Sequence, residues 1–377
     1  MPPPLIPFND LRRQWDATHQ EMTAAFQAVG ESGWYILGRE VAEFEAELAR
    51  FWEHSHAVGV ASGLDAIEIA LRIAGCKPGD KVLTTPNSAF ATTLAILKIG
   101  AIPVFADVDN FGLVDLSASE RILSADTNIR FFVPVHLYGH SLDLVRLREL
   151  KDRYRLVVVE DCAQSIGAKW YGESAGTVGQ LAATSFYPTK NLGAIGDGGA
   201  ILTSTPEFAE AARKYRDYGQ SAKYRHEVEG ANSRLDELQA ALLRRVGLPR
   251  LPDWTVRRKA LAARYSTGIA NRRITVPGVP VGSESVWHLF PVLVDPASKP
   301  AFLSHLKTSA IQAAEHFPIA IPDQSVMSSF RFEAPDQCPN ARRFCASEVS
   351  LPLYPFLTDA ECDRIIGVCN DWQSKAK

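Results

Sequence analysis

The 377-residue sequence predicts an α/β protein: a large domain built on a mostly parallel β-sheet covered by helices, and a smaller C-terminal α+β domain. Helical and strand-like patterns alternate between about residues 56 and 205, as they do in parallel sheets with helical crossovers. The strand-like runs are short and contain few polar residues, which is typical of strands covered on both faces. After "VGLPRLPDW", around Leu248–Pro252, this alternation stops. We therefore expect one domain at residues 1–250 and a second at residues 251–377.

Helices are predicted where apolar residues recur every three or four positions. In Glu40–Trp52, the side chains of Val41, Phe44, Leu48 and Phe51 share one helical face. A second helix is expected to begin at Ser62 or Asp65 and to end at Gly75, and a third to end at Gly100; the others are Pro206–Tyr218, Arg234–Val246, Trp254–Ile269, Pro300–Thr308 and Asp359–Trp372.

Strands are predicted in the short apolar runs between these helices. In the large domain they are "DKVLTT", "IPVFADV", "RFFVPVHL", "RLVVVED", "AATSFYP" and "GGAILTS", and the smaller domain offers "VWHLFPVLVD".

Composition excludes several classes of protein. The formal net charge is −3, so no overall positive field favours nucleic acid or a membrane surface. No apolar run reaches the roughly 18 residues of a membrane span, and the N-terminal residues lack an apolar signal core. The six cysteines form no CxxC pair and no Cys/His cluster with zinc-ligand spacing. We expect a reduced cytoplasmic protein without a metal site.

One lysine occupies an unusual setting. The stretch "TSFYPTKNLGAIGDGGA" contains Lys190 as its only lysine, directly after a predicted strand and before several glycines. A free lysine amine has a pKa of about 10.4 and is a poor nucleophile at neutral pH. Burial, or a covalent bond to an aldehyde, changes that. The setting favours a lysine that holds a covalent partner.

Two further features complete a pattern. Asp161 ends the predicted buried strand "VVVED", and Ser62 and Gly63 stand where a strand gives way to a helix. An aspartate at such an edge can face a cationic ring nitrogen, and a helix N-terminus can bind phosphate. Each feature alone also fits a simple helix cap. Together with Lys190, in this order along one sheet, they form the set expected for pyridoxal phosphate (PLP).

Five blocks of the sequence resemble the DegT/StrS-type aminotransferases of nucleotide-activated sugars. The blocks are "LGREVAEFEAELARFW", "VGVASGLDAIEIAL", "VEDCAQSIGA", "SFYPTKNLGAIGDGGAI" and "GANSRLDELQAALL". The resemblance runs from about Pro7 to the C-terminal helix. It implies PLP fold type I, with a mostly parallel sheet of the seven-stranded type, and PLP as the cofactor, with pyridoxamine phosphate as its amino-carrying form.

The resemblance also implies roles for individual residues. Lys190 would bond to the cofactor aldehyde and then move the proton at the substrate carbon. Asp161 would pair with the pyridinium nitrogen, and Gln164 would bind the ring hydroxyl. Many relatives have histidine where this chain has Ile166, so no acid–base role is expected at that position.

Phosphate and ring contacts follow from the same resemblance. Ser185 and the backbone amides near Gly63 and Leu64 would bind the phosphate, Phe90 would stack on the ring, and Asn232 would reach the phosphate from the neighbouring subunit of a homodimer. Simpler alternatives stay open: Phe90 in the core, Ser185 on a local backbone group, and Asn232 as a helix cap.

The substrate side is less defined by the sequence. Tyr187 is a candidate contact, whereas His136 and His316 are expected to be structural or entrance residues. Many relatives have threonine in place of Leu64, the usual "YGQ" reads "YGH" with His140, and the second histidine of "HYPxPxH" is replaced by Pro322. The substrate pocket or its lid is expected to be specialised.

The reaction implied is transfer of an amino group from an amino acid, such as L-glutamate, to a keto group of a nucleotide-linked sugar. "SGLDA" and "KYRHEVEGANSRLDE" favour C3 of a dTDP-3-keto-6-deoxyhexose. A UDP-linked or other 4-keto sugar and a keto-cyclitol stay open, as does a catalytically silent regulatory or structural protein of the same fold. The intact set of Lys190, Asp161 and Gln164 speaks against a silent protein.

Overall fold

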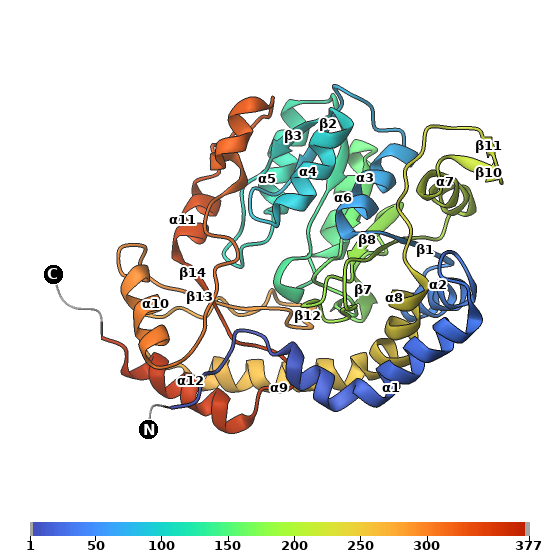
Figure 1. Ribbon diagram of the computed structural model, residues 1–377. Coiled ribbons are helices and arrows are strands. Elements are labelled where there is room, and N and C mark those ends of the chain that lie inside the picture. Colours follow the sequence, from blue (N-terminus) through green and yellow to red (C-terminus); the bar gives the residue numbers. More distant parts are fainter. Residues whose placement is uncertain (1–2, 374–377) are drawn as a thin grey trace.

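The computed structural model describes residues 3–373 and contains a central seven-stranded sheet (Figure 1). In spatial order the strands are β1 (His56–Val60), β9 (Gly199–Thr203), β8 (Leu181–Ser185), β5 (Val157–Asp161), β4 (Ile129–Val133), β2 (Lys81–Thr84) and β3 (Ile102–Phe105). Neighbours from β8 to β3 pair in parallel, and β9 runs antiparallel to β1 and β8. The predicted α/β class with a mostly parallel sheet is confirmed.

Helices cover both faces of this sheet, which explains why its strands are apolar at nearly every position. The α-helices of the chain are α1 (Leu11–Ser32), α2 (Arg39–Phe51), α3 (Gly63–Ile73), α4 (Phe90–Ile99), α5 (Leu116–Ala125), α6 (Leu144–Tyr154), α7 (Pro206–Arg216), α8 (Glu237–Leu242), α9 (Leu248–Gly268), α10 (Lys299–Thr308), α11 (Pro339–Ser347) and α12 (Asp359–Asp371). One core joins α3, α4 and α7 to the sheet, and the opposite face packs against α5, α6, α2 and α8. On β4, Phe131 lies in the first core and Phe132 in the second.

Short strands and turns complete the structure. They are β6 (Lys169–Trp170), β7 (Glu173–Ser174), β10 (Gln220–Ala222), β11 (Arg225–His226), β12 (Ser283–Glu284), β13 (Phe290–Leu293) and β14 (Glu348–Leu351), with 3-10 turns at Leu137–Gly139, Ile321–Asp323 and Ser325–Ser329 and a π-helical turn at Leu243–Gly247. No helix within residues 3–373 is both long and apolar enough to span a bilayer.

The C-terminal part has its own core around the antiparallel pair β13–β14, with α9, α10 and α12 packed on it. The start of the chain joins this core: the Ile6 amide donates to the Ala310 carbonyl at 2.9 Å, and Figure 1 shows this segment beside α12. By contrast, Phe344 of α11 lies in a core of the large sheet. The division at residue 250, which falls inside α9, stays a prediction.

Most predicted helices agree with the structure within a few residues, including α3, for which Ser62 is the N-cap. The helix predicted at Arg234–Val246 differs at both ends: α8 begins only at Glu237, and after Leu242 the chain continues as the π-helical turn. Four helices, α1, α5, α6 and α11, were not anticipated. In α1 only Thr18, Met22, Ala25 and Val29 are buried, so its apolar stripe is thin.

Candidate active site

Lys190 lies in the turn after β8. Its amide donates to the Tyr187 carbonyl at 2.8 Å, which closes the turn. The turn needs glycine at position 193, because a Cβ there would lie 2.3 Å from the Pro188 carbonyl oxygen. The side chain is half-buried, and its amine has no hydrogen bond or ion pair within the described part of the chain. Burial lowers the pKa of Lys190 to about 8, and the nearby Asp161 carboxylate opposes this shift. A sizeable neutral fraction of the amine is therefore present near neutral pH.

Asp161 ends β5, the parallel neighbour of β8. Its carboxylate is buried and accepts hydrogen bonds from the Thr92 hydroxyl at 2.8 Å and the Ala163 amide at 3.0 Å. Burial raises its pKa; the two donors and the charge of Lys190 lower it but do not outweigh burial. No ion pair with this carboxylate is found in residues 3–373.

Gln164 follows in the same segment and is buried. Its side-chain oxygen accepts from the Tyr138 amide at 2.7 Å. That bond fixes the orientation of the side-chain amide and leaves its NH₂ group as a donor for a ligand oxygen.

An anion-binding corner forms where α3 begins. The Ser62 hydroxyl accepts from the Asp65 amide at 3.1 Å, whereas the amides of Gly63 and Leu64 find no acceptor within the described residues. Ser185, the last residue of β8, lies directly against this corner: a Cβ on Gly63 would fall 2.6 Å from the Ser185 Cβ. Two open amides, a helix N-terminus and a hydroxyl together suit a phosphate. In the absence of a ligand, the Ser185 hydroxyl accepts from the Tyr187 amide at 3.2 Å.

The remaining predicted residues lie around this centre with fewer contacts. Phe90 is half-buried at the first position of α4, two residues before the Thr92 that binds Asp161. Tyr187 is 52% exposed. Asn232 is exposed, and no side-chain hydrogen bond holds it within residues 3–373. The structure thus brings the lysine, carboxylate and phosphate-type groups together, and leaves Tyr187 and Asn232 at the surface.

Two histidines from the C-terminal part lie near Lys190. Burial lowers the pKa of His316 to about 4, and it lowers the pKa of His288 well below its usual value; the charge of Lys190 adds to both shifts. The His288 ring contacts the Asn191 side chain at 3.1 Å. Sequence reasoning missed His288 and Thr92, because both reach the site only through the fold and belong to no local motif.

His136, His140 and Ile166 are buried. His136 bonds to Glu160 at 2.8 Å and accepts from the Leu142 amide, as expected for a structural residue. His140 contacts Ser285 at 2.8 Å, and burial lowers its pKa to about 3. Ile166 packs in an apolar core.

The group that fits this site carries an anion, an aldehyde and a cationic ring nitrogen. The corner at Gly63 offers donors for the anion, and Lys190 offers an amine for the aldehyde. Asp161 is a buried carboxylate that forms no ion pair with any described residue. PLP has all three features, so the residues present fit it.

The sequence and the fold both match known proteins. Residues 16–369 match the DegT/DnrJ/EryC1/StrS aminotransferase family. The chain is 41% identical to the dTDP-3-amino-3,4,6-trideoxy-alpha-D-glucose transaminase of Streptomyces venezuelae, over 99% of this chain and 97% of the relative. It is 39% identical to the dTDP-3-amino-3,6-dideoxy-alpha-D-galactopyranose transaminase of Aneurinibacillus thermoaerophilus, over 97% and 99%.

A solved structure is equally similar. DesV of S. venezuelae, in complex with a ketimine intermediate, superposes over 100% of both chains with a TM-score of 0.94 and 40% identity. These matches extend over nearly the whole chain. The chain belongs to the DegT/DnrJ/EryC1/StrS aminotransferase family.

Proposed function

We propose that the chain is a PLP-dependent aminotransferase that moves an amino group from L-glutamate to C3 of a dTDP-linked 3-keto-6-deoxyhexose. The observation that carries the chemistry is the Lys190 amine, which pairs with no described residue and lies near the buried Asp161 carboxylate; Asp161 ends β5, and Lys190 lies in the turn after the neighbouring strand β8. Family membership supports PLP as the cofactor. The two relatives above are named as transaminases of dTDP-3-amino sugars, which supports C3 as the aminated carbon and dTDP as the nucleotide of the substrate.

Bound PLP supplies an electron sink for the carbon next to the transferred nitrogen. Lys190 would hold the cofactor covalently and would carry the proton to and from that carbon. Its lowered pKa suits this role, because a base works best when its pKa is near the working pH. Asp161 would pair with the ring nitrogen of the cofactor and would keep that nitrogen protonated.

The other site residues orient the cofactor. Ser185 and the amides of Gly63 and Leu64 donate to its phosphate, and Gln164 donates to its ring oxygen. Phe90 stacks on the ring from the start of α4.

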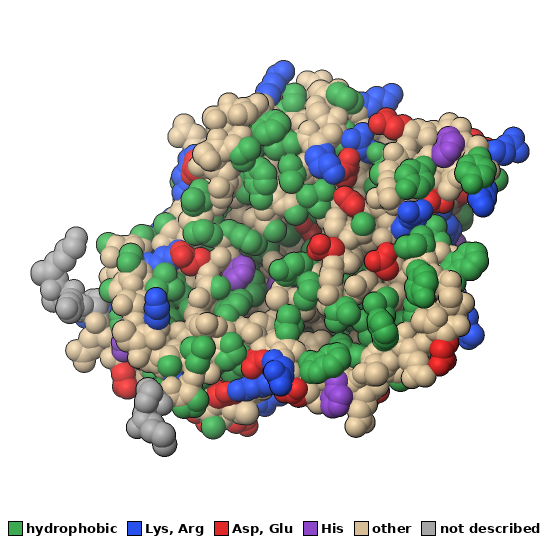
Figure 2. Space-filling view, in the orientation of Figure 1, with side chains coloured by type: hydrophobic (Ala, Val, Ile, Leu, Met, Phe, Trp, Pro, Cys, Tyr) green, Lys and Arg blue, Asp and Glu red, His purple; other side chains and the backbone are tan. Residues whose placement is uncertain are grey.

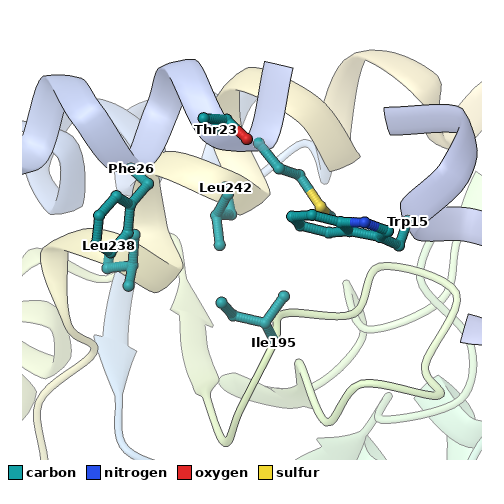
Figure 3. A pocket seen from close by; sticks show the side chains of 7 residues that line it. Trp15, Thr23, Phe26, Ile195, Leu238 and Leu242 are labelled. Atoms are coloured by element: carbon teal, nitrogen blue, oxygen red, sulfur yellow. The ribbon is translucent and has the colours of Figure 1, made fainter. Parts of the chain in front are cut away.

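A second copy of the chain completes the site in this proposal. An apolar groove lies between α1 and α8, lined by Trp15, Phe26, Leu238, Leu242 and Ile195 (Figure 3). Figure 2 shows hydrophobic side chains gathered on this part of the surface. Ile195 belongs to the same loop as Lys190 and is 55% exposed. A partner that covers the groove therefore also covers the loop of the lysine.

Exposed residues near the site are then available to the partner. Asn232 reaches the phosphate in the partner's site, and Tyr187 contacts the substrate at the mouth of its own site. The proposal predicts a homodimer in which Asn232→Ala weakens PLP retention without changing the oligomeric state. Equal PLP retention by this variant and the wild type would contradict the composite site.

The substrate is tested with a panel of nucleotide-linked keto sugars. The PLP-loaded enzyme is incubated with ¹⁵N-labelled L-glutamate and, in turn, dTDP-3-keto, dTDP-4-keto and UDP-linked keto sugars and a keto-cyclitol, and the products are analysed by mass spectrometry and NMR. The proposal expects ¹⁵N at C3 of the dTDP-3-keto sugar. Label at C4, or label only in a UDP-linked sugar or a keto-cyclitol, would show that the proposed substrate is wrong but that the proposed reaction is right. No label in any product would contradict the proposed function.

A further inference from the structure

His316 is held by contacts on nearly every side. Its amide donates to Glu348 Oε2 at 2.6 Å, and its carbonyl accepts from the Tyr138 hydroxyl at 2.5 Å. Its ring stacks on Phe8, with 5.3 Å between centroids and 21° between planes. Its Nδ1 lies 3.1 Å from Ser350 Oγ. A histidine near Lys190 with so many contacts has a fixed position and a ring held at Nδ1.

The contacts also fix which ring nitrogen carries hydrogen when Glu348 is ionised. Ser350 has one hydroxyl hydrogen and donates it to Glu348 Oε1 at 2.5 Å. Ser350 Oγ must therefore accept from His316, so Nδ1 carries the hydrogen and Nε2 carries a lone pair. Nε2 has no hydrogen-bond partner within residues 3–373, and it is not among the buried atoms sealed off without one. It is open to a ligand.

Glu348 and Ser350 are two residues apart on β14, so their side chains share one face of the strand. Glu348 is fully buried, and burial raises its pKa to about 7 in spite of the donors Ser350 and His316. Around it, Lys299 lowers this pKa and Glu315 raises it.

Two further ionisable groups that face Glu348 stay neutral near pH 7. The phenol of Tyr138 and the thiol of Cys345 also face Glu348, and their raised pKa values keep them neutral. On the ring side, burial and Lys190 lower the pKa of His316 to about 4, so the imidazole is neutral as well. Glu348 is thus the member of the relay that titrates near pH 7, whereas the Lys190 amine near His316 has a pKa of about 8.

We propose that His316, Ser350 and Glu348 form a proton relay that sets which ring nitrogen of His316 bears hydrogen, and so whether Nε2 accepts or donates a hydrogen bond to the substrate. When Glu348 gains a proton, one proton enters at Nε2, the Nδ1 hydrogen passes to Ser350 Oγ, and the Ser350 hydroxyl hydrogen passes to Glu348 Oε1. One proton is taken up in total and the imidazole stays neutral. The substrate part of this inference rests on the proposed function.

The relay gives Glu348 and Ser350 positioning roles without contact to the substrate. Above about pH 7, Nε2 accepts from a hydrogen-bond donor of the substrate, which is either a sugar hydroxyl or the ammonium of the amino donor. Below that pH, Nε2 donates, and the same group is bound less well.

NMR of the enzyme labelled with ¹⁵N-histidine tests the relay without any need for activity. His316 is assigned with His316→Gln, and its ring nitrogens are followed from pH 5.5 to pH 8.5. The relay predicts a shift from Nε2–H to Nδ1–H with a midpoint near pH 7. Glu348→Gln and Ser350→Ala are expected to abolish this titration, whereas Ser347→Ala, a nearby buried serine without a bond to His316, keeps it. One tautomer throughout in the wild type, or an unchanged midpoint in Glu348→Gln, would overturn the relay.

Kinetics of the two half-reactions then locate the bound group. At pH 8, Ser350→Ala is expected to raise KM about three- to tenfold for one substrate only, with kcat little changed, as for loss of one oriented hydrogen bond. A rise for the amino donor identifies its ammonium, and a rise for the keto sugar identifies a hydroxyl. No change in either KM would overturn the substrate contact even if the tautomer titrates. An enzyme that titrates but transfers no nitrogen would contradict the proposed function and leave the relay standing.

Discussion

Two consecutive carboxylates of β5, Glu160 and Asp161, have opposite environments. Both are buried and, as strand neighbours, they point to opposite faces of the sheet. Glu160 accepts from the His136 ring and from the amides of Gly176, Val178 and Gly179. Burial pushes its pKa up, but these donors outweigh burial and the net pKa is lowered. Asp161 has two donors, and its pKa is raised.

The difference separates a structural carboxylate from a functional one. Glu160 has all its partners inside the protein, so it ties the end of β5 to the loop at residues 176–179. Within residues 3–373 Asp161 forms no ion pair, and the Lys190 amine lies nearby without a hydrogen bond, which favours a role in binding a charged ligand. The same residue chemistry therefore supports the fold on one face and the proposed reaction on the other.

The largest expected effect comes from removing the amine that faces Asp161. Lys190→Ala is expected to lower the transamination rate by about 10³-fold or more, because both the covalent attachment and the proton carrier are lost. Turnover and the yellow absorbance of the lysine-bound cofactor are the measurements. Lys169→Ala, a surface lysine paired with Glu53, is the control and should behave as the wild type. If Lys190→Ala kept turnover within tenfold of the wild type, the proposed catalytic role of Lys190 beside Asp161 would be contradicted.

A crossed pair of substitutions tests the comparison itself. Asp161→Asn is expected to lower turnover by about 100-fold, because the negative charge that faces the ring nitrogen is lost. Its free energy of unfolding is expected to change by less than about 1 kcal/mol. Glu160→Gln is expected to lower the free energy of unfolding by about 3 kcal/mol, because a buried network loses its charge, while the folded fraction stays active. Denaturant unfolding and turnover are measured on both. Similar profiles for the two variants would show that the distinction between them is wrong.

A third buried carboxylate, Glu348, is expected to make the stability of the protein depend on pH. Its pKa rises from 4.5 to about 7 in the folded protein, so the native state binds a proton more tightly than the unfolded state. The resulting contribution to the free energy of unfolding is fully present below about pH 4.5 and is lost as pH rises through 7. In the wild type this loss amounts to about 3 kcal/mol, and it should be absent in Glu348→Gln. Denaturant unfolding at pH 5 and pH 8 is the measurement; an equal difference between variant and wild type at both pH values would contradict the shifted pKa.

The smallest effect is expected at the anion corner. Gly63→Ala would place a Cβ 2.6 Å from that of Ser185, so the strand end must move and PLP should be retained about tenfold less well. Equilibrium dialysis against PLP measures this. Gly367→Ala, whose added Cβ meets no atom within 4 Å, is the matched control. Unchanged retention in Gly63→Ala would place the phosphate elsewhere.

Much of the fold and the centre of the site could be predicted from the sequence. The apolar strands and the positions of Asp161, Ser185 and Lys190 follow from local patterns, because these residues end strands or begin turns. The thin apolar stripe of α1 hid that helix. The role of Thr92 beside Asp161 and the relay behind His316 could not be predicted, because they depend on contacts between segments far apart in the chain.

The central claim is that Lys190 is the lysine that carries the cofactor. It is tested most directly by loading the enzyme with PLP, reducing it with borohydride, and mapping the modified peptide by mass spectrometry. The account predicts one pyridoxyl group, on Lys190 in "SFYPTKNLG". Modification of another lysine, or no modification at saturating PLP, would contradict it.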